Sequence, residues 1–200
     1  MSAFNKVTQD SLDSIQVNAG VILRTFNPAE PAEPDDEDIV CATTGGITVN
    51  CTPSFEDFGA DIDNCPNNVV EMKRITDYEC TFSFTALDVT PESIKLALGA
   101  ATAFSSEVKA RRKLNVLDFE TLWFVSERVD DKIVAIQLTN ALSTGGLQLK
   151  TQKNGKGQLS VTLTGHVKME AADDVPMKFY VLEGVKGVSG HSLDDEYDEP

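Results

Sequence analysis

The chain has 200 residues, 41% of them hydrophobic and 24% charged, which suits one soluble domain with a sizeable core. Its formal net charge of -15 disfavours binding to nucleic-acid phosphates and anionic membranes. The first residues lack the apolar run of a signal peptide, and no stretch approaches the roughly 20 apolar residues of a membrane span. We therefore expect a protein that folds in a cytoplasm.

The N-terminal part is expected to contain two strands separated by a long acidic loop. After an N-terminal arm at 1–14, residues 15–26 are predicted to form a strand. Residues 27–46 are rich in proline and acid and end in a Thr-Thr-Gly-Gly turn, so they have too little apolar surface to order themselves. A second strand at 47–55 leads into an aspartate-rich segment at 55–77.

Alternation then marks a strand over residues 78–89. Cys80, Phe82 and Phe84 alternate with polar residues, the pattern of a strand with one apolar and one polar face. The next segment, 90–104, is predicted to be a helix, because Thr90 can cap it and a proline occupies the first helical position. Its apolar stripe consists of Ile94, Ala97, Leu98 and Ala101.

Four more strands are predicted in the C-terminal half, at 119–128, 132–142, 158–171 and 176–182. An Asn-Gly pair before the third of these is a strong signal for a tight turn. In that third strand, the side chains expected on one face are Leu159, Val161, Leu163, Val167 and Met169. The domain is thus expected to span 15–184, followed by an acidic C-terminal tail at 185–200.

These elements predict a mainly β fold. We expect an antiparallel β-sandwich or barrel with one flanking α-helix, long inter-strand loops and terminal arms. No internal repeat is visible in the sequence.

Residues 57–68, with the sequence DFGADIDNCPNN, raise the question of a calcium loop. An EF-hand counted from Asp61 would need glycine at its sixth position and glutamate at its twelfth, but those positions hold Pro66 and Met72. A calcium site of another type remains an alternative. The simpler interpretation is a turn whose Asp and Asn side chains bond local backbone amides.

No catalytic or cofactor site can be assembled from the sequence. The four cysteines, Cys41, Cys51, Cys65 and Cys80, form no C-x-x-C pair, so free and mostly buried thiols are expected instead of a zinc site. His166 and His191 are the only imidazoles. Neither a G-x-S-x-G elbow nor a phosphate-binding G-x-x-x-x-G-K loop is present. We expect no metal, no cofactor and no enzymatic activity.

A basic cluster lies at 109–113 and contains Lys109, Arg111, Arg112 and Lys113. It is short and has no interleaved aromatic residues, so nucleic-acid binding is not favoured. It is interpreted either as a solvated loop or as a complement to acidic loops on a neighbouring subunit.

Several stretches in succession resemble one family. The segments TTGGI, DFGADIDNCPNN, NALSTGG and LTGH occur in this order within residues 15–182. Together they resemble the major tail tube proteins of long-tailed, non-contractile bacteriophages. No single segment would be specific.

The resemblance implies a structural protein of the virion tail that is assembled in the host cytoplasm. In such families, six subunits form a ring with a continuous β-barrel as its inner wall, and the rings stack into a tube. The implied partners are other copies of the chain, the tape-measure protein, the tail terminator and the distal tail protein. Double-stranded DNA passes through the lumen without specific binding, and no membrane is involved.

The resemblance also assigns residues 55–77 to a contact loop between subunits. Phe58 is expected as an apolar anchor, and Gly59 and Pro66 as residues that fix the backbone. The polar side chains between them are expected to bond amides within the loop or across the interface. The predicted interface residues are Phe58, Gly59, Asp61, Asp63, Asn64, Pro66, Arg111 and Arg112.

Four alternatives stay open at this point. The nearest is another tube, either the inner tube of a contractile tail or the needle of a type VI secretion system. A monomeric β-barrel that binds a small ligand inside is a different class. A calcium-dependent extracellular module and an enzyme are less favoured, because the sequence lacks a signal peptide and a catalytic constellation.

Overall fold

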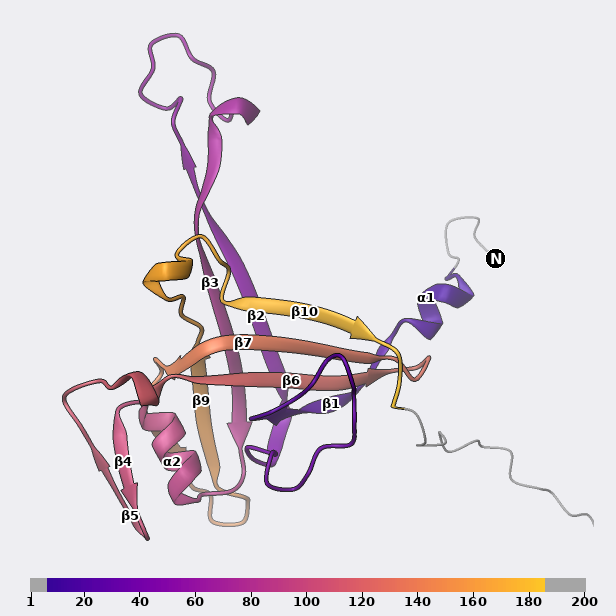
Figure 1. Cartoon of the computed structure of the whole chain (residues 1–200), viewed down its shortest axis with the longest axis vertical. Coiled ribbons are helices and arrows are strands. Elements are labelled where there is room, and N and C mark those ends of the chain that lie inside the picture. The colour runs from indigo at the N-terminus through magenta and orange to yellow at the C-terminus, as the bar shows by residue number, and fades with distance from the viewer. Residues whose placement is uncertain (1–6, 186–200) are drawn as a thin grey trace, which may run out of the picture.

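The computed structural model describes residues 7–185 and is mainly β (Figure 1). The body is one eight-stranded antiparallel sheet that folds into two layers, each called a sheet below. The β6–β7 sheet consists of β1 (Gln16–Leu23), β6 (Glu120–Arg128), β7 (Ile133–Ser143) and β10 (Met177–Leu182). The β3–β9 sheet consists of β2 (Thr43–Asp57), β3 (Lys73–Ala86), β9 (Gln158–Thr164) and β8 (Gln148–Lys150).

Strand β7 joins the two sheets. It pairs with β6 and β10 along most of its length, and with β9 only through Leu142 and Ser143 at its end. The strands of the two sheets cross steeply in Figure 1, the arrangement of sandwiches in which a strand passes from one sheet to the other at a corner. The predicted antiparallel sandwich with a flanking helix is confirmed.

The main core lies between the inner faces of the two sheets. The β6–β7 sheet contributes Ile22, Leu122, Phe124 and Leu138, and the β3–β9 sheet contributes Cys80, Phe82, Leu159, Val161 and Leu163. The alternation predicted for residues 80–86 and for the start of β9 is therefore correct. Burial of these side chains is the main term that holds the sandwich together.

A smaller cluster covers the outer face of the β6–β7 sheet. Trp123 packs with its ring centroid 5.4 Å from that of Phe26 and 5.6 Å from that of Tyr180. The acidic loop after β1 closes over this cluster, since its residue Ile39 forms a bridge with Leu23. The end of the loop is therefore anchored to the sheet by apolar contact.

Helix α2 (Pro91–Leu98) is shorter than the predicted helix at 90–104. Thr90 caps it as expected, accepting a hydrogen bond from the Ser93 amide at 3.1 Å. Gly99 ends it with a φ of 71°, a conformation that glycine adopts without steric cost. The residues beyond form β4 (Ala101–Phe104), which pairs with β5 (Glu107–Ala110), so Ala101 belongs to a strand and not to the helix stripe.

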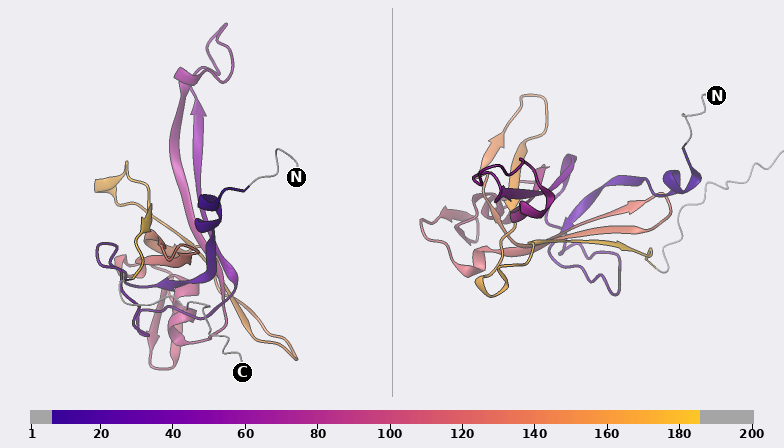
Figure 2. Two further views of the ribbon diagram at one scale, coloured as in Figure 1. Left: turned by 90° about the vertical axis from the view of Figure 1, so that its right-hand side faces the viewer. Right: turned by 90° about the horizontal axis from the view of Figure 1, so that it is seen from above.

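Strands β2 and β3 are longer than predicted and form a hairpin that projects far from the body (Figures 1 and 2). Because β2 begins at Thr43, the Thr-Thr-Gly-Gly turn lies inside the strand. There Gly45 and Gly46 have positive φ and the register with β3 shifts. Because β2 runs to Asp57 and β3 starts at Lys73, both ends of the predicted loop at 55–77 are paired strand, and residues 58–72 connect them.

Strand β9 ends at Thr164, before the predicted end at 171. The next residue, Gly165, is buried against β7: a Cβ at this position would lie only 2.6 Å from Leu138 Cδ1, so only glycine fits. The chain leaves the sheet at this close contact. Val167 and Met169 are consequently exposed, contrary to the prediction. The remaining short elements are α1 (Gln9–Asp13), η1 (Val70–Met72), η2 (Val116–Asp118) and η3 (Met169–Ala171).

The predicted terminal arms are described only in part. Helix α1 belongs to the predicted N-terminal arm, whereas 1–6 and 186–200, which hold most of the predicted acidic tail and His191, lie outside the described residues. Across residues 7–185, no helix combines the length and hydrophobicity needed to cross a bilayer.

Candidate assembly surfaces

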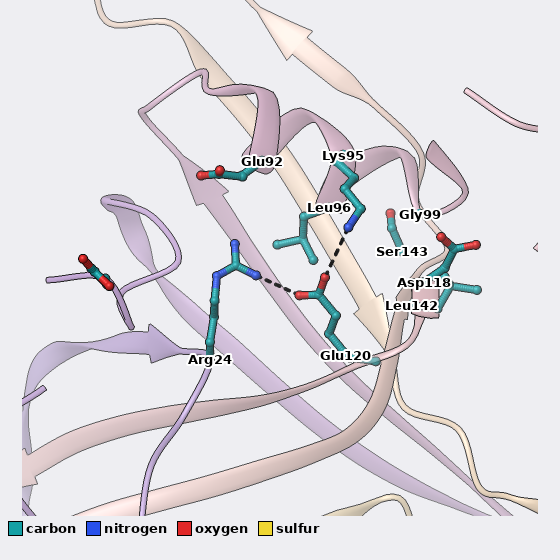
Figure 3. A pocket seen from close by; sticks show the side chains of 11 residues that line it. Arg24, Glu92, Lys95, Leu96, Gly99, Asp118, Glu120, Leu142 and Ser143 are labelled. Carbon is teal, nitrogen blue, oxygen red and sulfur yellow. Dashed lines mark hydrogen bonds and ion pairs between the residues drawn. The ribbon is translucent and has the colours of Figure 1, made fainter. Parts of the chain in front are cut away.

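A pocket of about 380 Å³ lies between α2, β6 and the segment after β1 (Figure 3). At its centre, a Glu120 carboxylate oxygen accepts a hydrogen bond from Arg24 Nη1 at 2.8 Å, and its other oxygen lies 3.7 Å from Lys95 Nζ. Ser143 Oγ donates to the Ala97 carbonyl at 2.6 Å. These contacts join three elements of the fold and leave no nucleophile paired with a base.

The cysteine thiols and the His166 imidazole are held by burial and by contacts within the fold. Burial raises the pKa of Cys41 to about 12, and burial together with a hydrogen bond to Cys51 raises the pKa of Cys80 to about 12. The Cys51 and Cys80 sulfurs face each other across β2 and β3 at 3.1 Å. His166 Nδ1 lies 3.2 Å from the Asn140 carbonyl oxygen. Within residues 7–185, no three His, Cys, Asp or Glu side chains gather as a metal site.

The first candidate surface is the far end of the β2–β3 hairpin, residues 55–75, called here the hairpin tip. Asp57 organises it: Oδ1 accepts from the Gly59 amide at 3.0 Å and Oδ2 from the Asn68 amide at 3.1 Å. The Arg74 guanidinium stacks over the Phe58 ring at 3.8 Å, an attractive contact between a cation and an aromatic face. The loop at the end is thus held by local bonds.

The predicted residues of the hairpin tip differ in burial. Gly59 is buried, and a Cβ there would lie 2.9 Å from Cys65 Sγ, so glycine is needed for this fold of the loop. The other predicted polar residues and the proline are exposed, namely Asp61, Asp63, Asn64 and Pro66. Within residues 7–185, the two aspartates make no side-chain hydrogen bond. Asp57, which the prediction did not assign, binds the loop amides; its position two residues before glycine in Asp-Phe-Gly was the available signal.

The second candidate surface is basic and surrounds the β4–β5 hairpin. Arg111 pairs with Asp118 and donates to the Lys113 carbonyl at 2.7 Å and the Ala101 carbonyl at 3.3 Å. It therefore links the β4–β5 hairpin to the segment that runs from Lys113 to η2. Arg112 is exposed. The two arginines, predicted as a pair of interface residues, thus differ in their surroundings.

The third candidate surface is the outer face of the β3–β9 sheet, called here the hydroxyl face. Its eight residues alternate with buried core residues of β3 and β9 and with partly buried residues of β2, and they carry short uncharged polar side chains: Thr48, Asn50, Thr81, Ser83, Thr85, Ser160, Thr162 and Thr164. They align in cross-strand rows, and in one row Ser83 Oγ donates to Thr162 Oγ1 at 3.4 Å. Charge occurs at the borders, with Glu79 further along β3 and Lys150 on β8.

The edges of the β3–β9 sheet are also open in this chain. Within residues 7–185, strand β2 ends the sheet on one side. On the other side, the end of β9 pairs with β7, and the three residues of β8 form the free edge beside the start of β9. A row of backbone amides and carbonyls at such an edge can pair with a strand of another chain.

Comparison with known proteins finds similarity to solved structures. No family model and no curated protein matches the chain. Among solved structures, a chain from "Virion of native gene transfer agent (GTA) particle" is similar, with a TM-score of 0.41 and 10% sequence identity. The superposition covers 81% of this chain and 95% of that chain. At this identity and TM-score, the likeness carries no conclusion about function.

Proposed function

We propose that this protein is a structural, non-enzymatic component of a phage-like virion, and specifically a subunit of its tail tube. Six copies form a ring, the rings stack, and DNA leaves through the bore after the tape-measure protein. The sequence resemblance of residues 15–182 to major tail tube proteins supports this proposal. The remaining support comes from the surfaces of the β3–β9 sheet.

The hydroxyl face is the observation that carries the proposal. Lysine and arginine bind DNA because each neutralised phosphate releases counterions. None of the eight residues of the hydroxyl face is charged, and the chain as a whole has a net charge of -15. A channel lined by this face would be wettable but would not hold a polyanion in place. We therefore assign the hydroxyl face to the wall of the bore.

Ring closure would also resolve the open edges of the same sheet. When the β2 edge of one copy meets the β8–β9 edge of the next, the sheets continue from subunit to subunit and become a closed barrel. A closed barrel has no edge left to aggregate. In this arrangement the apolar inner face of the β3–β9 sheet stays packed against the β6–β7 sheet, behind the wall.

The positions of the second pocket and of the main core bear on the alternative of a ligand-binding barrel. A second pocket, of about 720 Å³, lies beneath the acidic loop on the outer side of β1 and not between the two sheets. The space between the sheets is filled by the main core. The described part of the chain therefore favours a wall component over a barrel that holds a ligand inside. A contractile tail would differ by its sheath, which only microscopy of the particle can reveal.

Negative-stain electron microscopy of the concentrated protein tests the proposal. We expect hollow tubes of constant width that lengthen with protein concentration. A matched pair of variants sharpens the test: Thr162→Lys places a charge on the hydroxyl face, whereas Ala172→Lys places the same charge on an exposed residue between η3 and β10. DNA should be retained only by tubes of the first variant. A protein that stays monomeric at every concentration would contradict the proposal.

A further inference from the structure

We infer that the hairpin tip of one copy docks onto the basic patch of the next copy, head to tail. The basic patch is defined as residues 102–117, from β4 through β5 to the start of η2. This inference deepens the proposed function, because it names the two surfaces that would hold one ring on another.

The two surfaces lie at opposite ends of the molecule. In Figure 1 the hairpin tip is at the top of the longest axis and the β4–β5 hairpin is at the bottom, and the left view of Figure 2 shows the same separation. A shift of one copy along this axis therefore brings its hairpin tip towards the basic patch of another. The long β2–β3 hairpin supplies the reach.

The charges of the two surfaces are complementary. The hairpin tip holds five acidic and two basic residues, whereas the basic patch holds four basic residues and one acidic residue. Within each copy, Glu56 pairs with Arg74 and Arg111 pairs with Asp118. Asp57 is engaged by two backbone amides. Within residues 7–185, the other three acids of the hairpin tip and three bases of the basic patch make no ion pair; they are Asp61, Asp63, Glu71, Lys109, Arg112 and Lys113.

Both surfaces also expose large apolar side chains among these charges. In the hairpin tip, Val70 is 85% exposed and Ile62 is 50% exposed. In the basic patch, the corresponding side chains are Phe104, Leu114, Val116 and Leu117, with Val116 at 83%. Apolar groups surrounded by charged ones are the arrangement of an interface with a desolvated centre and a polar rim.

A second copy is the occupant that satisfies both surfaces at once. Pairing two hairpin tips, or two basic patches, would bring like charges together, which disfavours a twofold symmetric contact. Joining two different surfaces at opposite ends leaves one of each surface available after every addition. Such a heterologous contact continues as an open chain of subunits, which is the symmetry required for stacking.

A charge swap tests the docking. Sedimentation velocity would give the concentration for half-assembly of the wild type, of Asp61→Lys with Asp63→Lys, and of Arg112→Glu with Lys113→Glu. Each double reversal replaces attraction by repulsion at an exposed contact, so we expect this concentration to rise about tenfold. The variant with all four changes should return to within about threefold of the wild type. Added salt should weaken wild-type assembly.

Two matched controls make the same charge changes elsewhere on exposed residues. Asp173→Lys with Asp174→Lys mimics the change in the hairpin tip, and Lys168→Glu with Lys178→Glu mimics the change in the basic patch. Both controls should assemble within about twofold of the wild type. Equal effects in controls and test variants would show that assembly depends only on the net charge of the chain, and would overturn the inference.

Cross-linking gives a second readout. One preparation carries Val70→Cys and another Val116→Cys; oxidised glutathione takes up the two electrons as a disulfide forms between the copies. We expect more covalent dimer in the mixture of the two variants than in either preparation alone. The separate preparations measure the background from Cys65, the native thiol of the hairpin tip.

The outcomes separate the docking from the tube. Linear head-to-tail oligomers without a bore would support the docking and contradict the proposed tube. Tubes that form without cross-linking, and whose charge reversals are not rescued by the swap, would overturn the docking alone. A wild type that stays monomeric at every concentration would overturn both.

Discussion

The two halves of the β2–β3 hairpin are stabilised by different interactions. Where the hairpin lies in the body, Cys80, Phe82 and Phe84 are buried against the opposite sheet. In the hairpin tip, Phe55 and Ile75 have the same strand pairing but are exposed. Burial thus decides the structure of the body, whereas local bonds and strand pairing alone decide that of the hairpin tip. An ordered segment with exposed apolar groups is what an assembly contact needs before its partner arrives.

The hairpin tip is expected to be less stable than the body. An isolated two-stranded hairpin is marginally stable in water. Beyond its ladder, the hairpin tip is held by local, mostly solvent-exposed contacts, among them the Asp57 bonds, the pairing of Arg74 with Glu56 and the stacking of Arg74 on Phe58. We therefore expect it to open locally far more often than the body, and to become protected when a partner covers it.

The largest difference is expected between two phenylalanines of this hairpin. Phe82 is 0% exposed and Phe55 is 57% exposed. Phe82→Ala should lower the free energy of unfolding by about 3–5 kcal/mol, because it leaves a cavity in the main core. Phe55→Ala should change it by less than about 0.5 kcal/mol. Urea denaturation of the monomer measures both, and similar losses would show that the hairpin tip shares the stability of the body.

A smaller difference is expected between two adjacent arginines. Arg111→Ala removes the partner of Asp118, whose side chain is 3% exposed, and should cost about 1–3 kcal/mol of unfolding free energy. Arg112→Ala should leave that free energy unchanged within about 0.5 kcal/mol while weakening assembly. Thermal unfolding and sedimentation distinguish the two, and a destabilised Arg112 variant would argue against a role confined to contacts between copies.

The aspartates of the hairpin tip should differ on a still smaller, local scale. Asp57→Ala removes the acceptor of two backbone amides and should increase hydrogen exchange at Gly59 and Asn68 by about tenfold, with little change in global stability. Asp61→Ala should leave both exchange rates unchanged. Amide exchange measured by NMR tests this pair, and protection that survives in the Asp57 variant would show that other contacts hold the loop.

The smallest effect is expected from pH near neutrality. Cys41 and Cys80 have a pKa of about 12 in the folded chain, above the ordinary value of 9.0, because burial disfavours the thiolate. A raised pKa gives stability that is complete below pH 9.0 and is lost as the pH rises towards about 12. Unfolding measured from pH 7 to 10.5 should therefore be flat at first and fall only above 9. A Cys41→Ala variant should fall less steeply.

The sequence predicted the body well because burial leaves a periodic signal. Cys80, Phe82 and Phe84 alternate with polar residues, and the structure places them in the core. The helix start was predictable because Thr90 is a capping residue before a proline. Its end was misplaced because Ala101 continues the apolar spacing after Gly99, and only the pairing of β4 with β5 makes that segment a strand.

The surfaces were less predictable because they depend on pairing over long distances. The hydroxyl face exists because β2, β3 and β9 align in register, which the separate strand predictions could not provide. Likewise, nothing near Arg111 in the sequence shows that Asp118 will engage it while Arg112 stays exposed. Composition indicated an acidic protein, but only the fold separates an acidic end from a basic one.

Cryo-electron microscopy of the assembled tube would show directly which face of the chain lines the bore. We expect rings of six copies with the hydroxyl face towards the bore, Thr48, Ser83 and Thr162 among the lining residues, and each hairpin tip on the basic patch of a copy in the next ring. A bore lined by lysine and arginine, or a particle in which this chain stands apart from its own copies, would contradict this expectation.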